Sequence, residues 1–573
     1  MLIVRFVMYR RLALSILVAL LLSLTAAPVA VSAQGLHPSY SPHGDIDTVP
    51  FYPDGTYDPS VPHPDHYLQQ DIGQWPLRYH ELVEYLAALD GSTDRVIIDT
   101  EGETYEGRAI YNVFISTPSN IEKIEQVRLA VQQLANAEQL STAALDSIAQ
   151  NVPAIAWMGY SIHGDELSGT DAATRLIYQL AAGTDSLTQH LLENLVIIVQ
   201  PSQNPDGRER YLSMLQTYRS TVPNWDRYAM QHSGVWPWGR TNHYLFDLNR
   251  DWILLRQQET RNKIATLIRW NPQLVVDGHE MGSNATFLFS PPRQPINYHT
   301  PQHYLDWADK FADDQAKAFD DRSWPYYTGE WHEHWYPGYG SAWPTYFGAV
   351  GVLYEMAGVD GQVVRQRDDY LLTYHEAVNK QFTSSLANLQ TLANNREIFL
   401  RQYYQTRRSI IDEGRREGPT YLFKPDNDEL KMKRFIESLT AQAIEVTRAT
   451  EGFTVSNVID RYSDERGSMS FPAGTYIVSA AQPHGALVQA ILEFDPKLKL
   501  EFLKEERREL EKFGDTRMYE VSAWSPALAY DLDAYYTNGI VSVDDEPVAE
   551  VPLSVGVLQN ANARYGFIVP MVG

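Results

Sequence analysis

AIAWMGYSIHGDE, residues 154–166, joins an apolar strand-like run to a histidine, a glycine and two carboxylates. Three later runs are of the same kind: LVIIVQPS (195–202), LVVDGH (274–279) and VGVLYEMAG (350–358). Helical or loop segments separate the four runs. Short apolar strands that alternate with helices are typical of α/β proteins. We therefore predict a mixed, mostly parallel twisted sheet that is covered by helices on both faces.

Chemically capable side chains stand where these runs end. The first run leads to His163 and Glu166, the second leads to NPDG (204–207), the third ends in His279, and the fourth contains Glu355. In open α/β sheets the ligand crevice lies outside the carboxyl ends of the strands. We therefore expect these four strand ends to converge on one site.

These residue types favour a metal site. His163 and Glu166 are three positions apart at a strand-to-helix turn, and His279 is available as a third ligand. Two His and one Glu with an open fourth position form the ligand set of a catalytic zinc, whereas structural zinc sites are closed and usually rich in Cys. Glu355 is then the candidate to take a proton from water. His190 and Glu193 have the same spacing, but they follow a polar helix and are interpreted as a solvated surface pair.

Composition excludes several other classes. The 573 residues include no cysteine, so disulfides, a thiol nucleophile and Cys-ligated metals are excluded. The formal charge of −25 disfavours nucleic acid and anionic membranes as partners, because both require a basic surface. There is no GxSxG elbow and no HExxH motif.

The N-terminus predicts export. Arginines precede the apolar run Leu12 to Leu24, and the small residues VSA end at Ala33, which is the order of a secretory signal peptide over residues 1–33. An uncleaved membrane anchor is the alternative, although the run is short for a span, and no later segment approaches the ~20 apolar residues of a transmembrane helix. We expect a periplasmic or secreted protein with an irregular arm at 34–75.

Taken together, HGDE, NPDG, DLNRDW (247–252), DGHEMG (277–282) and LYEMAG (353–358) resemble the motifs of the M14 family of zinc carboxypeptidases. The resemblance runs from about Tyr79 to about Leu389. It implies a zinc peptidase catalytic domain over 76–393.

The resemblance also implies roles for single residues. It implies one Zn²⁺ on His163, Glu166 and His279, with Glu355 as the general base for a zinc-activated water.

Four further residues complete the implied site. The resemblance puts Asp247 beside His163 as the partner that orients it, and it has Asn249 and Arg250 grip the terminal carboxylate of the substrate. Arg240 in WGRTNHY is the implied stabiliser of the oxyanion, with Arg227 as an alternative.

Some features depart from the family pattern or leave the assignment open. Tyr336 fits best as the family's mobile substrate-binding tyrosine, with Tyr339 as an alternative. Asp165 stands where the animal digestive members carry an Arg. HEHW (332–335) adds two histidines near the expected cleft, and we interpret it as a solvated lid rather than a further metal or substrate contact.

Residues 394–573 are expected to form a second, smaller α/β region. A charged helical stretch leads to TYLF, an amphipathic helix, further strand-like runs and a helix at HGALVQAILEF (484–494). Long exported bacterial members of the family have similar phrases and continue into a further domain, so we expect this region to be incomplete at its end.

The function that the resemblance implies is a metallocarboxypeptidase, a hydrolase that removes C-terminal residues from peptides with a free carboxylate. One alternative is a zinc amidase or deacylase of the same fold that acts on N-acyl amino acids or cell-wall peptides. A non-catalytic binding module is a further alternative, which the complete ligand set disfavours. The sequence leaves the oligomeric state open.

Overall fold

The computed structural model describes residues 50–548 apart from residues 138, 427, 464–465, 519–520 and 522. The predicted signal peptide at 1–33 and the predicted incomplete end from 549 onward lie outside the described residues. Within the described part of the chain, no helix is long and apolar enough to cross a membrane.

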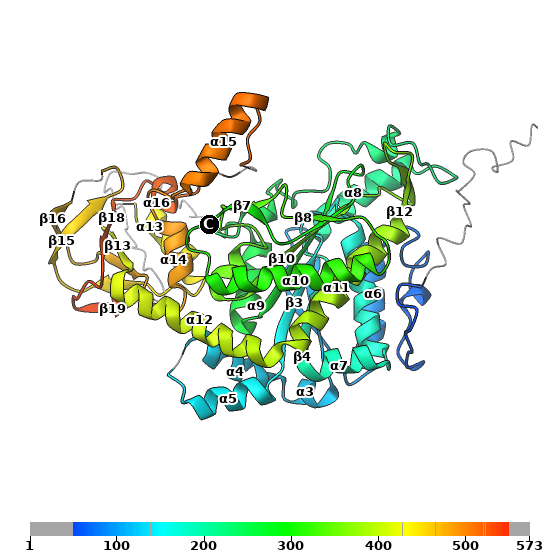
Figure 1. Cartoon of the computed structure of the whole chain (residues 1–573), viewed down its shortest axis with the longest axis horizontal. Helices are drawn as coiled ribbons and strands as arrows, with labels where there is room; N and C mark the ends of the chain where they lie inside the picture. Colours follow the sequence, from blue (N-terminus) through cyan, green and yellow to red (C-terminus); the bar gives the residue numbers. More distant parts are fainter. Residues whose placement is uncertain are drawn as a thin grey trace, which may run out of the picture. The chain divides into compact units, whose positions relative to one another are not determined.

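The central element is an eight-stranded mixed sheet (Figure 1). In spatial order its strands are β1 (Val96–Glu103), β2 (Ala109–Ile115), β4 (Leu195–Gln200), β3 (Ala154–Tyr160), β5 (Leu274–Met281), β10 (Val350–Ala357), β6 (Phe287–Phe289) and β8 (Tyr327–Thr328). The four strands predicted from the apolar runs form one continuous parallel block, β4-β3-β5-β10. The antiparallel hairpin β1–β2 extends one edge. The predicted mixed, mostly parallel sheet is thus confirmed.

Helices and 3₁₀ turns (labelled η) alternate with these strands. They are η3 (Pro64–His66), α2 (Tyr79–Leu89), α3 (Pro118–Glu122), α4 (Ile124–Ala135), α5 (Thr142–Asn151), α6 (Ser168–Ala182), α7 (Ser186–Asn194), α8 (Pro205–Tyr218), η4 (Met230–His232), η5 (Leu248–Arg250), α9 (Gln258–Trp270), α10 (Gln302–Asp320), η6 (Trp343–Phe347), α11 (Tyr374–Asn394) and α12 (Arg396–Glu417). Two small sheets pair β7 (Arg293–Ile296) with β9 (Glu333–His334), and β11 (Val363–Arg365) with β12 (Leu371–Thr373).

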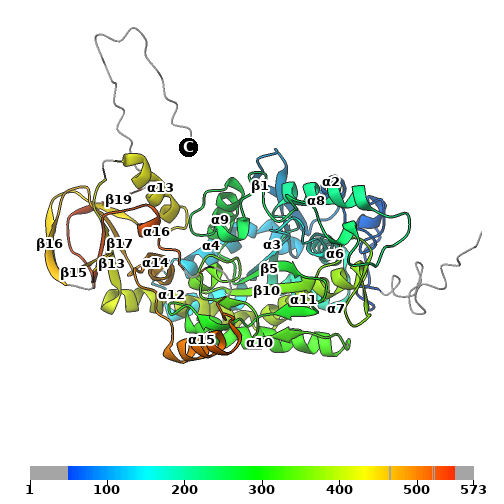
Figure 2. The same ribbon diagram turned by 90° about the horizontal axis from the view of Figure 1, so that it is seen from above.

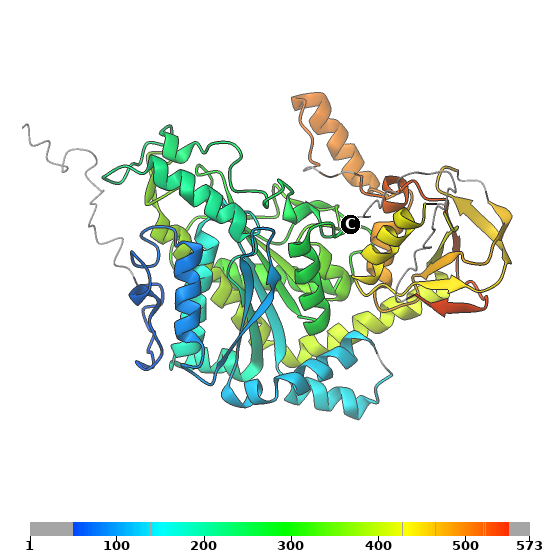
Figure 3. The same cartoon turned by 180° about the vertical axis from the view of Figure 1, so that it is seen from behind.

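Alternation along β3 shows why both faces of the sheet are covered. Met158 and Tyr160 belong to the core that α6, α10 and α11 share, whereas Ile155 and Trp157 belong to the core that α4 and α9 share. Successive strand residues point to opposite faces, so a strand that is apolar at every position must be buried on both. Figure 2 shows α9 and α10 on opposite sides of β5 and β10, and Figure 3 shows the side that carries β1 and α9.

The C-terminal part of the described chain contains a second sheet, whose seven strands pair antiparallel. In spatial order they are β16 (Gly467–Phe471), β15 (Phe453–Asp460), β18 (Ala534–Asn538), β13 (Pro419–Phe423), β17 (Tyr476–Ser479), β14 (Thr447–Ala449) and β19 (Asp545–Pro547). Its helices are α13 (Glu429–Thr440), α14 (Gly485–Leu492), α15 (Leu500–Phe513) and α16 (Pro526–Ala529).

Side chains connect this region directly to the first sheet's helices and loops. Gln442 donates from Nε2 to the Ile253 carbonyl at 3.1 Å, and its Oε1 accepts from Trp343 Nε1 at 2.9 Å. Apolar residues of α13 and α14 belong to the same hydrophobic cluster as α9 and η6. The described part of the chain from Pro50 onward, to residue 548, therefore packs as one compact unit.

Candidate metal centre and its cleft

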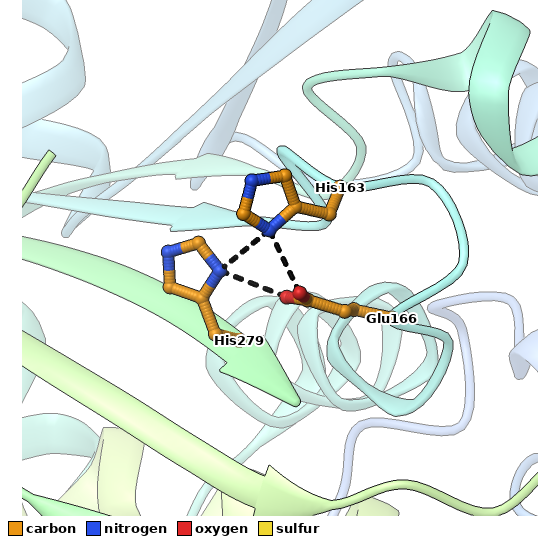
Figure 4. A group of neighbouring side chains, drawn as sticks. All are labelled: His163, Glu166 and His279. Atoms are coloured by element: carbon orange, nitrogen blue, oxygen red, sulfur yellow. Dashed lines mark hydrogen bonds and ion pairs between the residues drawn. The ribbon is translucent and has the colours of Figure 1, made fainter. Parts of the chain in front are cut away.

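Three predicted ligands converge at the carboxyl end of the parallel block (Figure 4). His163 follows β3, Glu166 precedes α6, and His279 lies within β5. One ligand atom from each residue lies within 4.8 Å of the other two. Nδ1 of His163 is 2.7 Å from Glu166 Oε1, and Nδ1 of His279 is 2.8 Å from Glu166 Oε2. Among the described residues, this trio is the group of His, Asp and Glu that could hold a metal ion.

A carboxylate orients each imidazole from behind. His163 Nε2 is 3.1 Å from Asp247 Oδ1, and His279 Nε2 is 2.9 Å from Asp277 Oδ2. A proton on each Nε2 leaves the Nδ1 lone pair facing the centre, as metal-ligating histidines require. Although burial opposes it, the carboxylates of Asp277 and Glu166 raise the pKa of His279 well above its usual value.

Asp277 was not predicted from the sequence, although a signal exists. It stands two positions before His279 in the same strand, so the two side chains leave the strand on the same face. An acidic residue at that position was available as a partner for the histidine.

The turn that carries His163 depends on close backbone approaches. A Cβ on Gly164 would lie 2.1 Å from the Arg208 backbone nitrogen, and Gly164 itself donates to the Gly239 carbonyl at 2.9 Å. The NPDG segment therefore packs behind the turn that carries His163, and it does not line the site. Asn204 caps α8 and donates to the Arg240 carbonyl at 3.2 Å. Three of the four predicted strand ends supply groups to the site, and the second supports its loops.

Glu355 stands opposite His279 in the register of β10 against β5. It is 8% exposed and lines the cleft, and its Oε2 is buried without a hydrogen-bond partner among the described residues. Burial raises the pKa of Glu355 to about 8, and the carboxylate of Glu166 adds to this shift while the neighbouring imidazoles oppose it. An orphaned carboxylate oxygen beside three ligand atoms fits a site that holds water near a cation.

Two arginines, Arg240 and Arg250, line this cleft. Arg240 binds Asp247 Oδ2 from Nε at 2.9 Å, and its Nη1 is 3.3 Å from His163 Nδ1. Arg250 lies with its guanidinium 4.8 Å from the ring centroid of Tyr339. Arg227, the alternative to Arg240, donates to Asn284 Oδ1 and is not among the cleft-lining residues.

Asn249 lines the cleft beside Arg250, and its predicted contact with the substrate stays a prediction. It is 5% exposed, and its Nδ2 lies 3.1 Å from Asp277 Oδ2 and 3.0 Å from His279 Nε2. Its Oδ1 accepts from Trp252 Nε1 at 2.9 Å and from the Gly340 backbone at 2.8 Å. The amide nitrogen donates to Asp277, whose carboxylate holds His279, so Asn249 supports this histidine through Asp277.

Tyr336 is packed and is not among the residues that line the cleft, and its predicted substrate-binding role stays a prediction. It is 5% exposed, and its hydroxyl donates to the Arg250 carbonyl at 3.1 Å. Tyr339, which the sequence left as an alternative, lines the cleft. Tyr336 and Tyr339 belong to one aromatic stretch, so the sequence pattern could not show which ring packs in the core and which lines the cleft.

The HEHW segment is not a solvated lid. His332, Glu333 and His334 are all buried, and His332 and Glu333 line the cleft. His334 lies 3.1 Å from Ser341 Oγ. By contrast, the control pair behaves as predicted, since Glu193 is exposed and His190 contacts Asn394 at 2.9 Å.

Residues 82–342 match the family model described as zinc carboxypeptidase. A protein of Trichophyton verrucosum named Probable carboxypeptidase 2 is 30% identical over 131 residues, which are 23% of this chain and 20% of that protein. The chain thus spans about one fifth of the length of that curated relative.

Solved structures of metallocarboxypeptidases are similar at low identity. A metallo-carboxypeptidase from Burkholderia cenocepacia is 14% identical and covers 58% of this chain and 70% of its own, with a TM-score of 0.38. Carboxypeptidase A from Helicoverpa armigera is 18% identical and covers 58% and 74%, with a TM-score of 0.34. The family match over 82–342 identifies this stretch of the chain as a zinc carboxypeptidase domain of the M14 peptidase type.

Proposed function

We propose that the protein is a zinc-dependent metallocarboxypeptidase that hydrolyses C-terminal residues from peptides. The observation that carries this proposal is the convergence of the His163–Glu166–His279 trio with Glu355 in one cleft. The trio supplies two imidazole nitrogens and one carboxylate, the donor set of catalytic zinc sites. The two supporting carboxylates, Asp247 and Asp277, suit a divalent cation that needs neutral imidazole ligands.

Zinc on this trio would polarise a substrate carbonyl and lower the pKa of water to about 7. Glu355 supplies the proton transfers. Its buried Oε2 accepts a proton from the attacking water, and the same oxygen gives that proton to the leaving amine nitrogen. Because burial favours the neutral form of Glu355, its carboxylate is a stronger base than an exposed one.

Arg240 and Arg250 have separate roles in the proposed reaction. Arg240 is held by Asp247 beside the ligands, so its guanidinium can donate to an oxyanion that forms there. Arg250 lies farther along the cleft against Tyr339, where its planar guanidinium can bind a terminal carboxylate bidentately. We also assign Asn249 to holding Asp277, the carboxylate that in turn holds His279.

The test compares two peptides that differ only in a free or an amidated C-terminus. The zinc-loaded protein is expected to cleave the free peptide and to leave the amidated one intact, since Arg250 needs a carboxylate to bind. A chelator should abolish the cleavage. Equal cleavage of both peptides would instead support the amidase alternative, in which the metal trio is kept and the carboxylate contact is relaxed.

We also propose that the protein is exported, which rests on the basic, apolar and small-residue order of residues 1–33. Expression of the full chain in a bacterial host should give a periplasmic or secreted product whose N-terminus is Gln34. A product in the membrane fraction that retains residues 1–33 would support the anchor alternative.

A further inference from the structure

Two adjacent side chains on the cleft wall have polar atoms without partners. Glu333 is fully buried, and its Oε1 makes no hydrogen bond within the described part of the chain. His332 is 6% exposed, and both of its ring nitrogens lack a hydrogen-bond partner there as well. Both residues line the cleft that holds the metal trio. The pair therefore offers several unused acceptor and donor positions to a ligand.

Such an arrangement is costly unless something binds to it. An unsatisfied buried polar atom costs about 1–3 kcal/mol, and more if it is charged. The fold uses only one oxygen of Glu333, since Oε2 accepts from the Trp335 backbone nitrogen. Of the two arginines whose charge acts on Glu333, Arg293 donates to the Arg517 carbonyl instead of to Oε1.

His332 and Glu333 interact electrostatically with charged groups at both ends of the proposed site. The charge of Arg250 acts on Glu333, and the charge of His279 acts on His332. In the proposed site, Arg250 binds the terminal carboxylate of the substrate, and the peptide carbonyl of the same residue faces the metal trio. The side chain of that residue then lies between Arg250 and the trio. His332 and Glu333 belong to the wall that meets that side chain.

We propose that His332 and Glu333 form the pocket for the side chain of the substrate's C-terminal residue, and that this side chain is cationic. The inference rests on the proposed carboxypeptidase function and names its substrate class: peptides that end in Lys or Arg. An ammonium or guanidinium group has only donors, and it pairs with the free Oε1 of Glu333 and with one nitrogen of a neutral His332.

The protonation of the two residues agrees with a cation. Burial lowers the pKa of His332 to about 3, so the ring is neutral and can accept a hydrogen bond. Burial raises the pKa of Glu333 to about 7, against the opposing effect of its backbone hydrogen bonds and of two arginines. A bound cation favours the ionised carboxylate and so is preferred over an apolar side chain of equal size.

The experiment uses the zinc-loaded full chain and one peptide body that ends in Lys, Arg, norleucine or Glu. Norleucine has nearly the shape of Lys without its charge. We expect kcat/KM for Lys or Arg to exceed that for norleucine at least tenfold, and the Glu-ending peptide to be the poorest substrate. The Lys and Arg arms show whether an ammonium or a guanidinium is preferred.

Glu333→Gln tests the residue, because Gln keeps an oxygen for the Trp335 nitrogen. This variant should lose at least tenfold of the preference for Lys over norleucine. Glu330→Gln is the matched control, since Glu330 is exposed in the same loop, and it should keep the preference. Zinc content and thermal unfolding verify that both variants are folded.

The outcomes separate this inference from the proposed function. If the wild type cleaves Lys and norleucine peptides equally, or if Glu333→Gln keeps the Lys preference, the pocket assignment is wrong and the carboxypeptidase proposal stands. If no peptide with a free carboxylate is cleaved, the proposed function itself fails. The wild-type series decides the question even where Glu333→Gln does not fold.

Discussion

At the scale of single residues, the site depends on the carboxylates that hold the two histidine ligands on the side away from the metal. Asp247 and Asp277 hold the two imidazoles by Nε2, and Asn249 donates to Asp277. The ligands could be predicted from spacing because His163 and Glu166 are neighbours in sequence and His279 ends a recognisable strand. The inward turn of Asn249 could not be predicted, because it depends on Asp277 and on the Gly340 backbone, which are distant in sequence.

Loss of the carboxylate that orients one histidine ligand should weaken metal binding, although all three ligands remain. We expect Asp277→Asn to lower zinc affinity about 10- to 100-fold, the usual cost of losing an outer-shell partner. Competition with a chromophoric chelator measures this affinity. Asp251→Asn is the control, since Asp251 is also buried but accepts from the Arg256 and Gln257 backbone instead. Equal losses in both variants would mean that Asp277 has no specific role.

Glu166→Gln should abolish tight zinc binding, because it removes a ligand that both histidines contact. Glu193→Gln is its matched control, since Glu193 belongs to the exposed pair with the same spacing. Zinc stoichiometry by atomic absorption checks the expected values, near zero for the first variant and near one for the second. A stoichiometry near one for Glu166→Gln would place the metal elsewhere.

At the scale of elements, the parallel block could be predicted and its register could not. Continuous apolar runs indicate buried strands, but the pairing of Glu355 with His279 depends on how β10 slides against β5. The polar stretch between β2 and β3 does not form one helix. The chain forms α3, α4 and α5 instead, because Lys123 interrupts the first turn, Ala137 adopts a φ of +50°, and Ser141 caps a new helix.

The turn between β3 and α6 should tolerate no side chain at Gly164. An added Cβ would lie 2.1 Å from the Arg208 nitrogen and 2.7 Å from the Gly239 carbonyl, and backbone atoms cannot move aside as a flexible side chain does. We expect Gly164→Ala to lower the free energy of unfolding by about 1–3 kcal/mol or more and to weaken zinc binding. Gly282→Ala, whose Cβ meets nothing within 4 Å, should change neither. Urea unfolding that leaves Gly164→Ala as stable as Gly282→Ala would contradict this account of the turn.

At the scale of the whole molecule, the C-terminal region reaches the cleft loop. The Trp524 ring packs against Tyr336 at a centroid distance of 5.7 Å, and Tyr336 holds the Arg250 carbonyl. Such aromatic pairs contribute about 0.5–1.5 kcal/mol. This contact could not be predicted, because nothing in the local pattern links residues so far apart in the chain.

We therefore expect Trp524→Ala to raise KM about 2- to 10-fold for a peptide with a free carboxylate, because Arg250 loses its support, while zinc affinity stays unchanged. Steady-state kinetics with separate kcat and KM values measure this. Phe513→Ala, which removes an exposed ring of the same region, should have no effect. A fall in kcat alone would argue against a role in substrate binding.

Buried neutral histidines should make the whole fold sensitive to acid. Burial lowers the pKa of His303 to about 4, whereas an unfolded histidine titrates near 6.5. The unfolded chain therefore binds more protons between these values, so stability is full above pH 6.5 and is lost as the pH falls towards 4, by about 3 kcal/mol for this residue.

His303→Leu should flatten the pH dependence of the free energy of unfolding between pH 6.5 and 4.5. His80→Gln, at an exposed position, should not. Urea titrations at several pH values provide the comparison. An unchanged slope in His303→Leu would show that other groups govern the acid sensitivity.

The central claim is that one zinc ion on His163, Glu166 and His279 makes this chain a carboxypeptidase. The most direct test titrates zinc into the chelator-treated protein while following hydrolysis of a peptide with a free C-terminus. The account predicts activity that rises linearly to a plateau at one equivalent of zinc in the wild type, and none at any zinc level in His279→Ala. Full activity before zinc is added, or a His279→Ala variant that reaches the same plateau, would contradict it.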